Sequence, residues 1–166
     1  MQLALRLGRV QLIRKVVIAA LIVAITAFVA VTAPAIPNRS FLHEAIEWGG
    51  LLMLGTAIVG RTWSTFYIGG HKLSTLVFAG PYSIVRNPLY VFSIIGAAGA
   101  GAQTGSFTIA GIMAALTWAV FAVVVAKEEA ALAEKLGAPY LAYMQSVPRF
   151  LPNFALWQSP DLVEIR

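Results

Sequence analysis

The sequence contains no cysteine and only two histidines among its 166 residues. The lack of cysteine excludes disulfide bonds, thiolate metal ligands and cysteine nucleophiles. The histidines, His43 and His71, lie far apart and lack the spacing of metal ligands, so no metal centre is predicted. Charged residues are also scarce, at 11% of the chain, against roughly 25% in a typical soluble domain.

Apolar residues, in contrast, make up 59% of the chain. This balance predicts an all-α integral membrane protein with a single domain over residues 1–166. The net charge is +5, but the basic residues lie between apolar runs instead of forming one basic face. That distribution is typical of membrane orientation, so we expect the bilayer, and not a nucleic acid, as the partner.

Four apolar runs have approximately the length needed to cross a bilayer. We expect transmembrane helices at about residues 16–32, 45–67, 89–105 and 107–125. Residues 1–15 are interpreted as an interfacial amphipathic helix, with a signal peptide as the alternative. No helix breaker follows the fourth run before Gly137, so its helix should leave the bilayer and end there, ahead of a short cytoplasmic helix at 139–146.

Lysine and arginine are concentrated in the N-terminal arm, the loop at 69–87 and the C-terminal region, whereas the opposite loops hold only Arg39. Because basic loops stay in the cytoplasm, both termini of this multi-pass protein are expected there, in a bacterial inner membrane. The topology places residues 80–90 on the same membrane face as Glu128 and Glu129.

Residues 80–90 (GPYSIVRNPLY) combine two prolines with several polar side chains between two apolar runs. Proline breaks regular backbone, and broken backbone beside membrane helices persists only where protein or a water-filled cavity satisfies it. Asn87 before Pro88 is a typical helix N-cap signal, and Arg86 would strengthen an anion site at that helix start. Alternatively, Arg86 anchors at the lipid headgroups and Asn87 forms an ordinary turn.

Glu128 and Glu129 come where the fourth helix should leave the bilayer. Adjacent helical side chains point about 100° apart, so at least one carboxylate is expected to face the bundle. Arg86 or Arg149 could then pair with it. The alternative is a solvated helix end with exposed charges.

Three other polar side chains lie in apolar surroundings. Tyr140 and Tyr143 share one face of the last short helix and are either site residues or interfacial tyrosines. Arg61 lies in the later half of the second run and is expected to face protein.

Two segments together resemble a membrane methyltransferase signature. The front half covers residues 71–90, beginning HKL, and the back half covers residues 128–152, beginning EE and ending VPRFLP. In this order and at this separation they are similar to the isoprenylcysteine carboxyl methyltransferase family, which is related to the phospholipid methyltransferases.

The resemblance implies S-adenosylmethionine as the methyl donor, bound in a cytoplasmic-side pocket between the two halves. The cofactor-binding residues it implies are Tyr82, Arg86, Asn87, Pro88, Tyr90, Glu128, Glu129, Tyr140 and Tyr143. Glu129 and Arg86 are the residues expected to be catalytic. The implied acceptor is lipophilic and enters from the bilayer, and a carboxylate is favoured because it is already ionised at neutral pH.

Two alternatives to a carboxylate methyltransferase stay open. One is methylation of an amine or a phospholipid headgroup, for which a glutamate could act as base. The other is a non-catalytic membrane scaffold of the same fold. The sequence also departs from the family in two places: Asn87 stands where histidine is frequent, and residues 122–125 are apolar where prenylcysteine enzymes carry an arginine.

Overall fold

The computed structural model describes residues 40–69 and 78–159. Within these residues the chain is helical and contains no strand. The elements are α2 (Phe41–Gly69), α3 (Pro81–Ile84), α4 (Pro88–Ala102), α5 (Phe107–Leu136), α6 (Ala138–Ser146) and the 3-10 turn η1 (Phe154–Leu156). The expected N-terminal amphipathic helix, the first span at 16–32 and the start of the front signature half lie outside the described residues.

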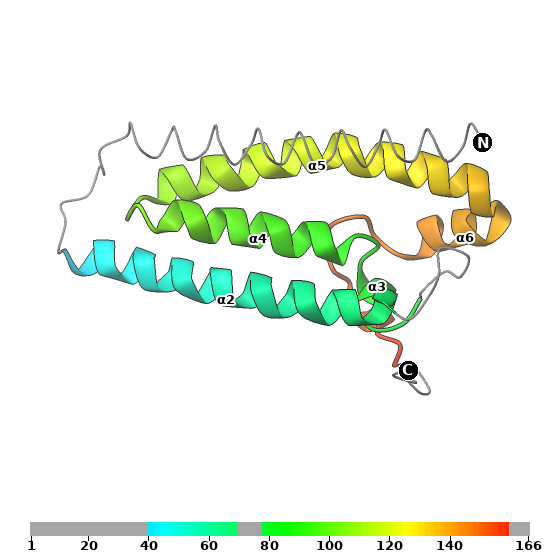
Figure 1. Cartoon of the computed structure of the whole chain (residues 1–166), viewed down its shortest axis with the longest axis horizontal. Helices are drawn as coiled ribbons and strands as arrows, with labels where there is room; N and C mark the ends of the chain where they lie inside the picture. Colours follow the sequence, from blue (N-terminus) through cyan, green and yellow to red (C-terminus); the bar gives the residue numbers. More distant parts are fainter. Residues whose placement is uncertain (1–39, 70–77, 160–166) are drawn as a thin grey trace.

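Helix α4 lies between α2 and α5, and α3, α6 and the C-terminal segment gather at one end of these three helices (Figure 1). With 30 residues, α5 is about 45 Å long, whereas α4 has 15 residues and is about half as long. The last turns of α5 therefore extend past the start of α4, towards α6.

Small residues allow the three long helices to approach closely. A Cβ atom on Gly99 of α4 would lie 2.7 Å from the carbonyl oxygen of Gly50 in α2. On the other side of α4, a Cβ atom on Gly101 would lie 2.7 Å from the Cα atom of Ala110 in α5. Glycines in the third apolar run therefore permit close helix packing.

Helix boundaries follow local sequence signals. Pro88 occupies the first turn of α4, after Asn87 at the N-cap. Ser106 caps α5 by accepting a hydrogen bond from the backbone N–H of Ile109 at 3.4 Å. Helix α5 ends at Gly137, whose φ of 65° favours glycine. The predicted continuity of this helix and its stop are both confirmed, and α2 begins earlier than predicted, at Phe41.

Of the described helices, α5 alone has both the length and the hydropathy to cross a bilayer. Helix α4 is apolar but shorter, and α2 is long enough but is made less apolar by glycines, hydroxyl residues and Arg61. Large apolar side chains nevertheless lie exposed along α2, among them Trp48, Leu52 and Phe66. The expected number of four spans stays a prediction.

Candidate active site

Residues 80–87 precede α4 and carry most of the described part of the front signature half. Gly80 begins this segment with a φ of 62°, and a Cβ atom there would lie 2.3 Å from the ring of Tyr67. One helical turn, α3, follows, and Val85 is extended. Pro88 disfavours a helical conformation in the residue before it, so Arg86 and Asn87 are held between two helices.

The C-terminal segment binds this irregular segment through its backbone. The N–H of Arg86 donates to the carbonyl of Pro148, and the N–H of Asn153 donates to the carbonyl of Ile84, each at 2.9 Å. Farther along, the N–H of Gly80 donates to the carbonyl of Gln158 at 2.9 Å. The described parts of the two signature halves therefore lie against each other.

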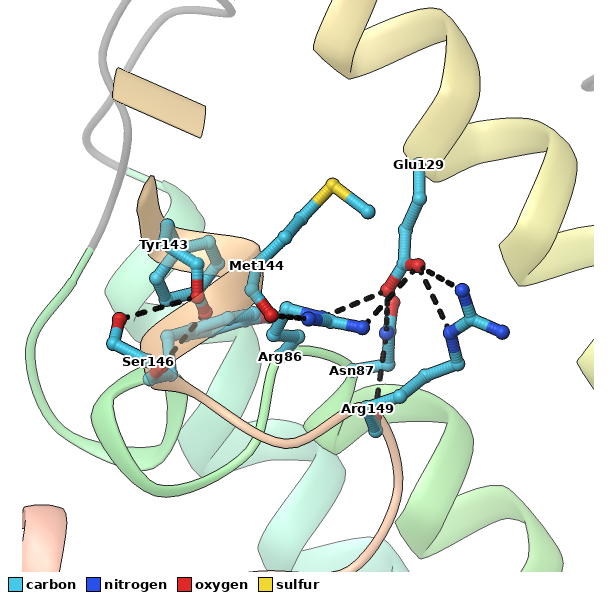
Figure 2. A network of polar contacts seen from close by, with 8 residues as sticks. Arg86, Asn87, Glu129, Tyr143, Met144, Ser146 and Arg149 are labelled. Carbon is cyan, nitrogen blue, oxygen red and sulfur yellow. Dashed lines mark hydrogen bonds and ion pairs between the residues drawn. The ribbon is translucent and has the colours of Figure 1, made fainter. Parts of the chain in front are cut away.

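Glu129 lies at the centre of a network that joins both halves (Figure 2). Its side chain is 2% exposed. Its Oε1 atom accepts hydrogen bonds from Arg86 Nε and Asn87 Nδ2, each at 3.0 Å. Its Oε2 atom contacts Arg149 through Nη2 at 2.7 Å and Nε at 2.9 Å. This carboxylate therefore faces the bundle, as predicted for at least one of the two glutamates, and it pairs with both of the arginines that were named as possible partners.

Arg86 is held on more than one side. Its side chain is 8% exposed, and its Nη2 also donates to Glu129 Oε2 at 3.4 Å. Its Nη1 donates to the backbone carbonyl of Met144 in α6. Because these contacts come from both α5 and α6, the guanidinium has a fixed orientation.

Asn87 departs from its predicted role as a helix cap. It occupies the N-cap position of α4, but its side chain does not cap the helix. Its Nδ2 atom instead donates to Glu129 and, at 3.3 Å, to the backbone carbonyl of Arg149. The amide therefore connects α5 to the C-terminal segment.

The charges of this cluster do not cancel. Two arginines surround one glutamate, which leaves one surplus positive charge. A buried ion pair is favourable only when its geometry and remaining hydrogen bonds are good, and Glu129 meets both conditions. Arg149 is 41% exposed, whereas its partners are buried, so the surplus charge reaches the surface at Arg149.

The neighbouring carboxylate, Glu128, points elsewhere. Its Oε2 atom accepts a hydrogen bond from the Tyr90 hydroxyl at 2.8 Å. The Tyr90 ring packs edge-on against Phe121 at 4.7 Å between centroids. The two adjacent glutamates thus contact different residues, as expected for neighbours on one helix.

The tyrosines of α3 and α6 form a packed group. The Tyr143 hydroxyl donates to the backbone carbonyl of Tyr82 at 2.7 Å, and Tyr140 and Tyr143 are buried in a small core with Val147. Burial raises the pKa of all three tyrosines, and that of Tyr140 reaches about 12. The Tyr82 hydroxyl is buried and has no hydrogen-bond partner among the residues that the structure describes.

A cavity of about 490 Å³ adjoins this tyrosine group. Both signature halves contribute to its wall, with Phe78 and Ser83 from the first and Tyr143 and Ser146 from the second. Gln158 adds an amide. Its volume lies in the range of small-molecule sites, roughly 300–1,000 Å³.

Residues 48–138 match the phospholipid methyltransferase family. The chain belongs to this family. The matched residues include Arg86, Asn87 and both glutamates. The predicted relation to the phospholipid methyltransferases is therefore confirmed. The narrower assignment to the isoprenylcysteine carboxyl methyltransferases stays a prediction. Membership and helix α5 together indicate that this phospholipid methyltransferase family protein is associated with a membrane.

Two curated proteins are similar to this family member. The nickel-cobalt-cadmium resistance protein NccN of Alcaligenes xylosoxydans xylosoxydans is 36% identical over 122 residues, covering 74% of this chain and 57% of the relative. The cobalt-zinc-cadmium resistance protein CzcN of Cupriavidus metallidurans is 36% identical over 109 residues, covering 66% and 50%. The chain therefore spans about half the length of these relatives. No solved structure matches it.

The structure brings most of the predicted site residues of this phospholipid methyltransferase family member to one end of the helices. Arg86, Asn87 and Glu129 lie in one network, and Glu128 and Tyr90 lie beside it. Tyr82, Tyr140 and Tyr143 pack together a short distance away, and Pro88 is buried at the start of α4. Arg149 was predicted as a possible partner of a glutamate but not as a catalytic or cofactor-binding residue, although its position in the back signature half was a signal for it. The Met144 carbonyl could not be found from side-chain chemistry.

Proposed function

We propose that this protein transfers a methyl group from S-adenosylmethionine to a lipophilic acceptor at the membrane. The observation that carries the proposal is the Glu129 network, because it joins Arg86 and Asn87 of one signature half to Arg149 of the other. Membership of the phospholipid methyltransferase family supports the same reaction. We further propose a multi-pass inner-membrane topology with this site on the cytoplasmic face.

The donor set suits the charges of the cofactor. When bound, S-adenosylmethionine supplies an electrophilic methyl group on a cationic sulfonium, next to a methionyl carboxylate and ammonium. Arg149 carries the surplus positive charge and is partly exposed, so it would hold the carboxylate. Glu128 is the carboxylate that would face the cationic groups. The cavity beside Tyr143 offers aromatic rings together with hydroxyl and amide groups to a nucleoside.

The geometry supports a positioning role for Glu129 and not the role of a base. Both of its oxygens accept hydrogen bonds from Arg86, Asn87 and Arg149. A carboxylate in this state cannot accept a proton from a substrate without losing those partners. Its contribution is to fix the two guanidinium groups, since methyl transfer depends mainly on alignment and on the exclusion of water.

The acceptor that we favour is a carboxylate on an apolar molecule. Such a nucleophile is ionised at neutral pH and requires no base. The alternative is the amine of a lipid headgroup, which the description of the family supports and for which Glu128 is the candidate base. Incubating lipid extracts with methyl-labelled cofactor distinguishes the two by the product that carries the label. The names of both relatives make metal resistance the proposed physiological setting.

Binding of S-adenosylhomocysteine to the detergent-purified protein tests the cofactor assignment. Isothermal titration calorimetry should show binding by the wild type and a dissociation constant about tenfold or more higher in Arg149→Gln, because one charge-assisted contact is lost. Arg149 is the suitable position because its exposure lets the fold tolerate the change. Lys127→Gln removes an exposed charge from the same part of α5 and is the control.

Two outcomes would reject the assignment. The first is a wild type that binds no S-adenosylhomocysteine at millimolar concentration, which would favour a non-catalytic scaffold. The second is equal affinity in the wild type and Arg149→Gln, which would place the cofactor away from this network.

A further inference from the structure

Arg61 is a charged residue of α2 that the Glu129 network does not use. Its side chain is exposed, and its Nη1 donates to the Leu89 carbonyl at 3.0 Å and to the Ser93 hydroxyl. No carboxylate within residues 40–69 and 78–159 forms an ion pair with it. An arginine beside apolar helices is costly unless a partner compensates its charge.

The contacts of Arg61 place it at the level of the candidate active site. Leu89 and Ser93 belong to the first two turns of α4. Tyr90 lies on the same two turns and binds Glu128 of α5. The start of α4 therefore separates Arg61, on the side of α2, from Glu128, on the side of α5.

Arg61 also acts electrostatically on a second polar group, the side chain of Tyr82. The Tyr82 hydroxyl is buried, and none of the described residues forms a hydrogen bond with it. The positive charge of Arg61 partly offsets the rise in the Tyr82 pKa that burial causes, so its electrostatic field reaches the phenol. A buried hydroxyl without a partner is unfavourable, and a ligand oxygen could supply the missing hydrogen bond.

The guanidinium group has the chemistry to bind an oxyanion. It carries five N–H donors in a planar fork that matches the oxygens of a carboxylate or a phosphate. The bonds to Leu89 and Ser93 come from Nη1, so contact with α4 fixes the group while its Nε and Nη2 make no hydrogen bond with a described residue. The exposed apolar side chains of α2 lie along the same helix.

We propose that Arg61, assisted by the Tyr82 hydroxyl, binds the oxyanion of an amphiphilic molecule and thereby selects the methyl acceptor. The bound group is a carboxylate or a phosphate attached to an apolar chain. The identification of this molecule as the acceptor rests on the methyltransferase function proposed above, whereas the binding site itself does not. Arg61 is thus a specificity-determining residue on the side of α4 opposite Glu128.

Calorimetric titration of the full chain in detergent tests this site with three soluble amphiphiles: octyl phosphate, octanoate and the neutral octanol. The wild type should bind at least one anion more tightly than octanol. Arg61→Gln should weaken binding of that anion about tenfold or more, because a charge-assisted contact is lost. Arg61→Lys should recover part of the affinity, since it restores the charge without the fork. Lys127→Gln is the matched control and should change nothing.

The preferred anion identifies the source of the oxyanion. Tighter binding of octyl phosphate indicates a phospholipid headgroup, and tighter binding of octanoate indicates a free carboxylic acid. Tyr82→Phe should weaken binding of the same anion without lowering thermal stability, because the hydroxyl that it removes has no partner among the described residues.

The failure of this site and the failure of the methyltransferase function give different results. Equal binding of the anions by the wild type and Arg61→Gln overturns the site, even when S-adenosylhomocysteine binds. If the anions bind in a way that depends on Arg61 but S-adenosylhomocysteine does not bind, the proposed oxyanion site is retained and the methyltransferase function is rejected. When both the oxyanion site and the methyltransferase function are correct, the affinity for S-adenosylhomocysteine should differ by less than about twofold between the wild type and Arg61→Gln, since the proposed cofactor site uses other residues.

Discussion

Replacing Glu129 by glutamine should destabilise the protein substantially. Glutamine keeps one acceptor oxygen, but its second terminal group is an amide that donates. In the structure that group would face the donors of Arg86 and Asn87 if it took the place of Oε1, or those of Arg86 and Arg149 if it took the place of Oε2. The substitution therefore removes the negative charge and also places donors against donors.

The size of the effect follows from the burial of the two arginines. Removing one member of a buried ion pair costs about 3–5 kcal/mol, because the other charge stays buried without a partner. Arg86 is 8% exposed and cannot recover its hydration, whereas Arg149 is 41% exposed and can turn towards water. We therefore expect the lower end of the range, about 3 kcal/mol, which is a large fraction of a typical stability of 5–15 kcal/mol.

Thermal unfolding in detergent, followed by far-UV circular dichroism, measures this loss. For a chain of this size about 3 kcal/mol corresponds to a fall in the unfolding midpoint of roughly 6–12 °C. Glu134→Gln makes the same chemical change at an exposed position of α5 and should leave the midpoint nearly unchanged. A midpoint of Glu129→Gln equal to that of the wild type would refute the view that this network holds the two signature halves together.

Three further predictions follow from the packing and the protonation states. Gly99→Ala should lower stability by about 1–3 kcal/mol, because the added Cβ atom would meet the backbone of α2. Gly111→Ala is the control and should be tolerated, because its Cβ atom would lie in open space. Thermal unfolding compares the two variants. Burial raises the pKa of Tyr140 to about 12, so the folded protein retains this proton at a higher pH than the unfolded chain does. The free energy of unfolding should therefore fall between about pH 10 and about pH 12. Tyr140→Phe should reduce this fall, as unfolding curves at alkaline pH would show. Asn87→His keeps a hydrogen-bond donor towards Glu129 and should make S-adenosylhomocysteine binding depend on pH near about 6.5, as titration calorimetry at several pH values would show.

The course of the helices could largely be predicted from the sequence because their boundaries are local. Pro88 and Gly137 mark helix ends by their backbone conformation and Ser106 does so by its side-chain cap, and the structure places the ends there. The number of transmembrane spans could not be predicted from such local signals. Helix α2 is long but contains glycines, hydroxyl residues and Arg61, so length and hydropathy give different answers for it.

The site was only partly predictable, because side-chain roles depend on contacts between distant segments. The helical angle between Glu128 and Glu129 correctly implied that one of them is buried, but not which one. Asn87 carries a typical capping signal, yet its amide binds Glu129 because that carboxylate offers a charged acceptor. The role of Met144 is carried by its backbone carbonyl, which no side-chain pattern can indicate.

The backbone hydrogen bonds between residues 80–87 and the C-terminal segment also determine the order in which the site can be built. A chain is synthesised from its N-terminus, so α2, α4 and α5 leave the ribosome before the segment that carries Arg149. Until then Glu129 has Arg86 as its only charged partner among the residues that form the network. The helices can therefore pack together first, and the site is completed only when the segment that carries Arg149 arrives.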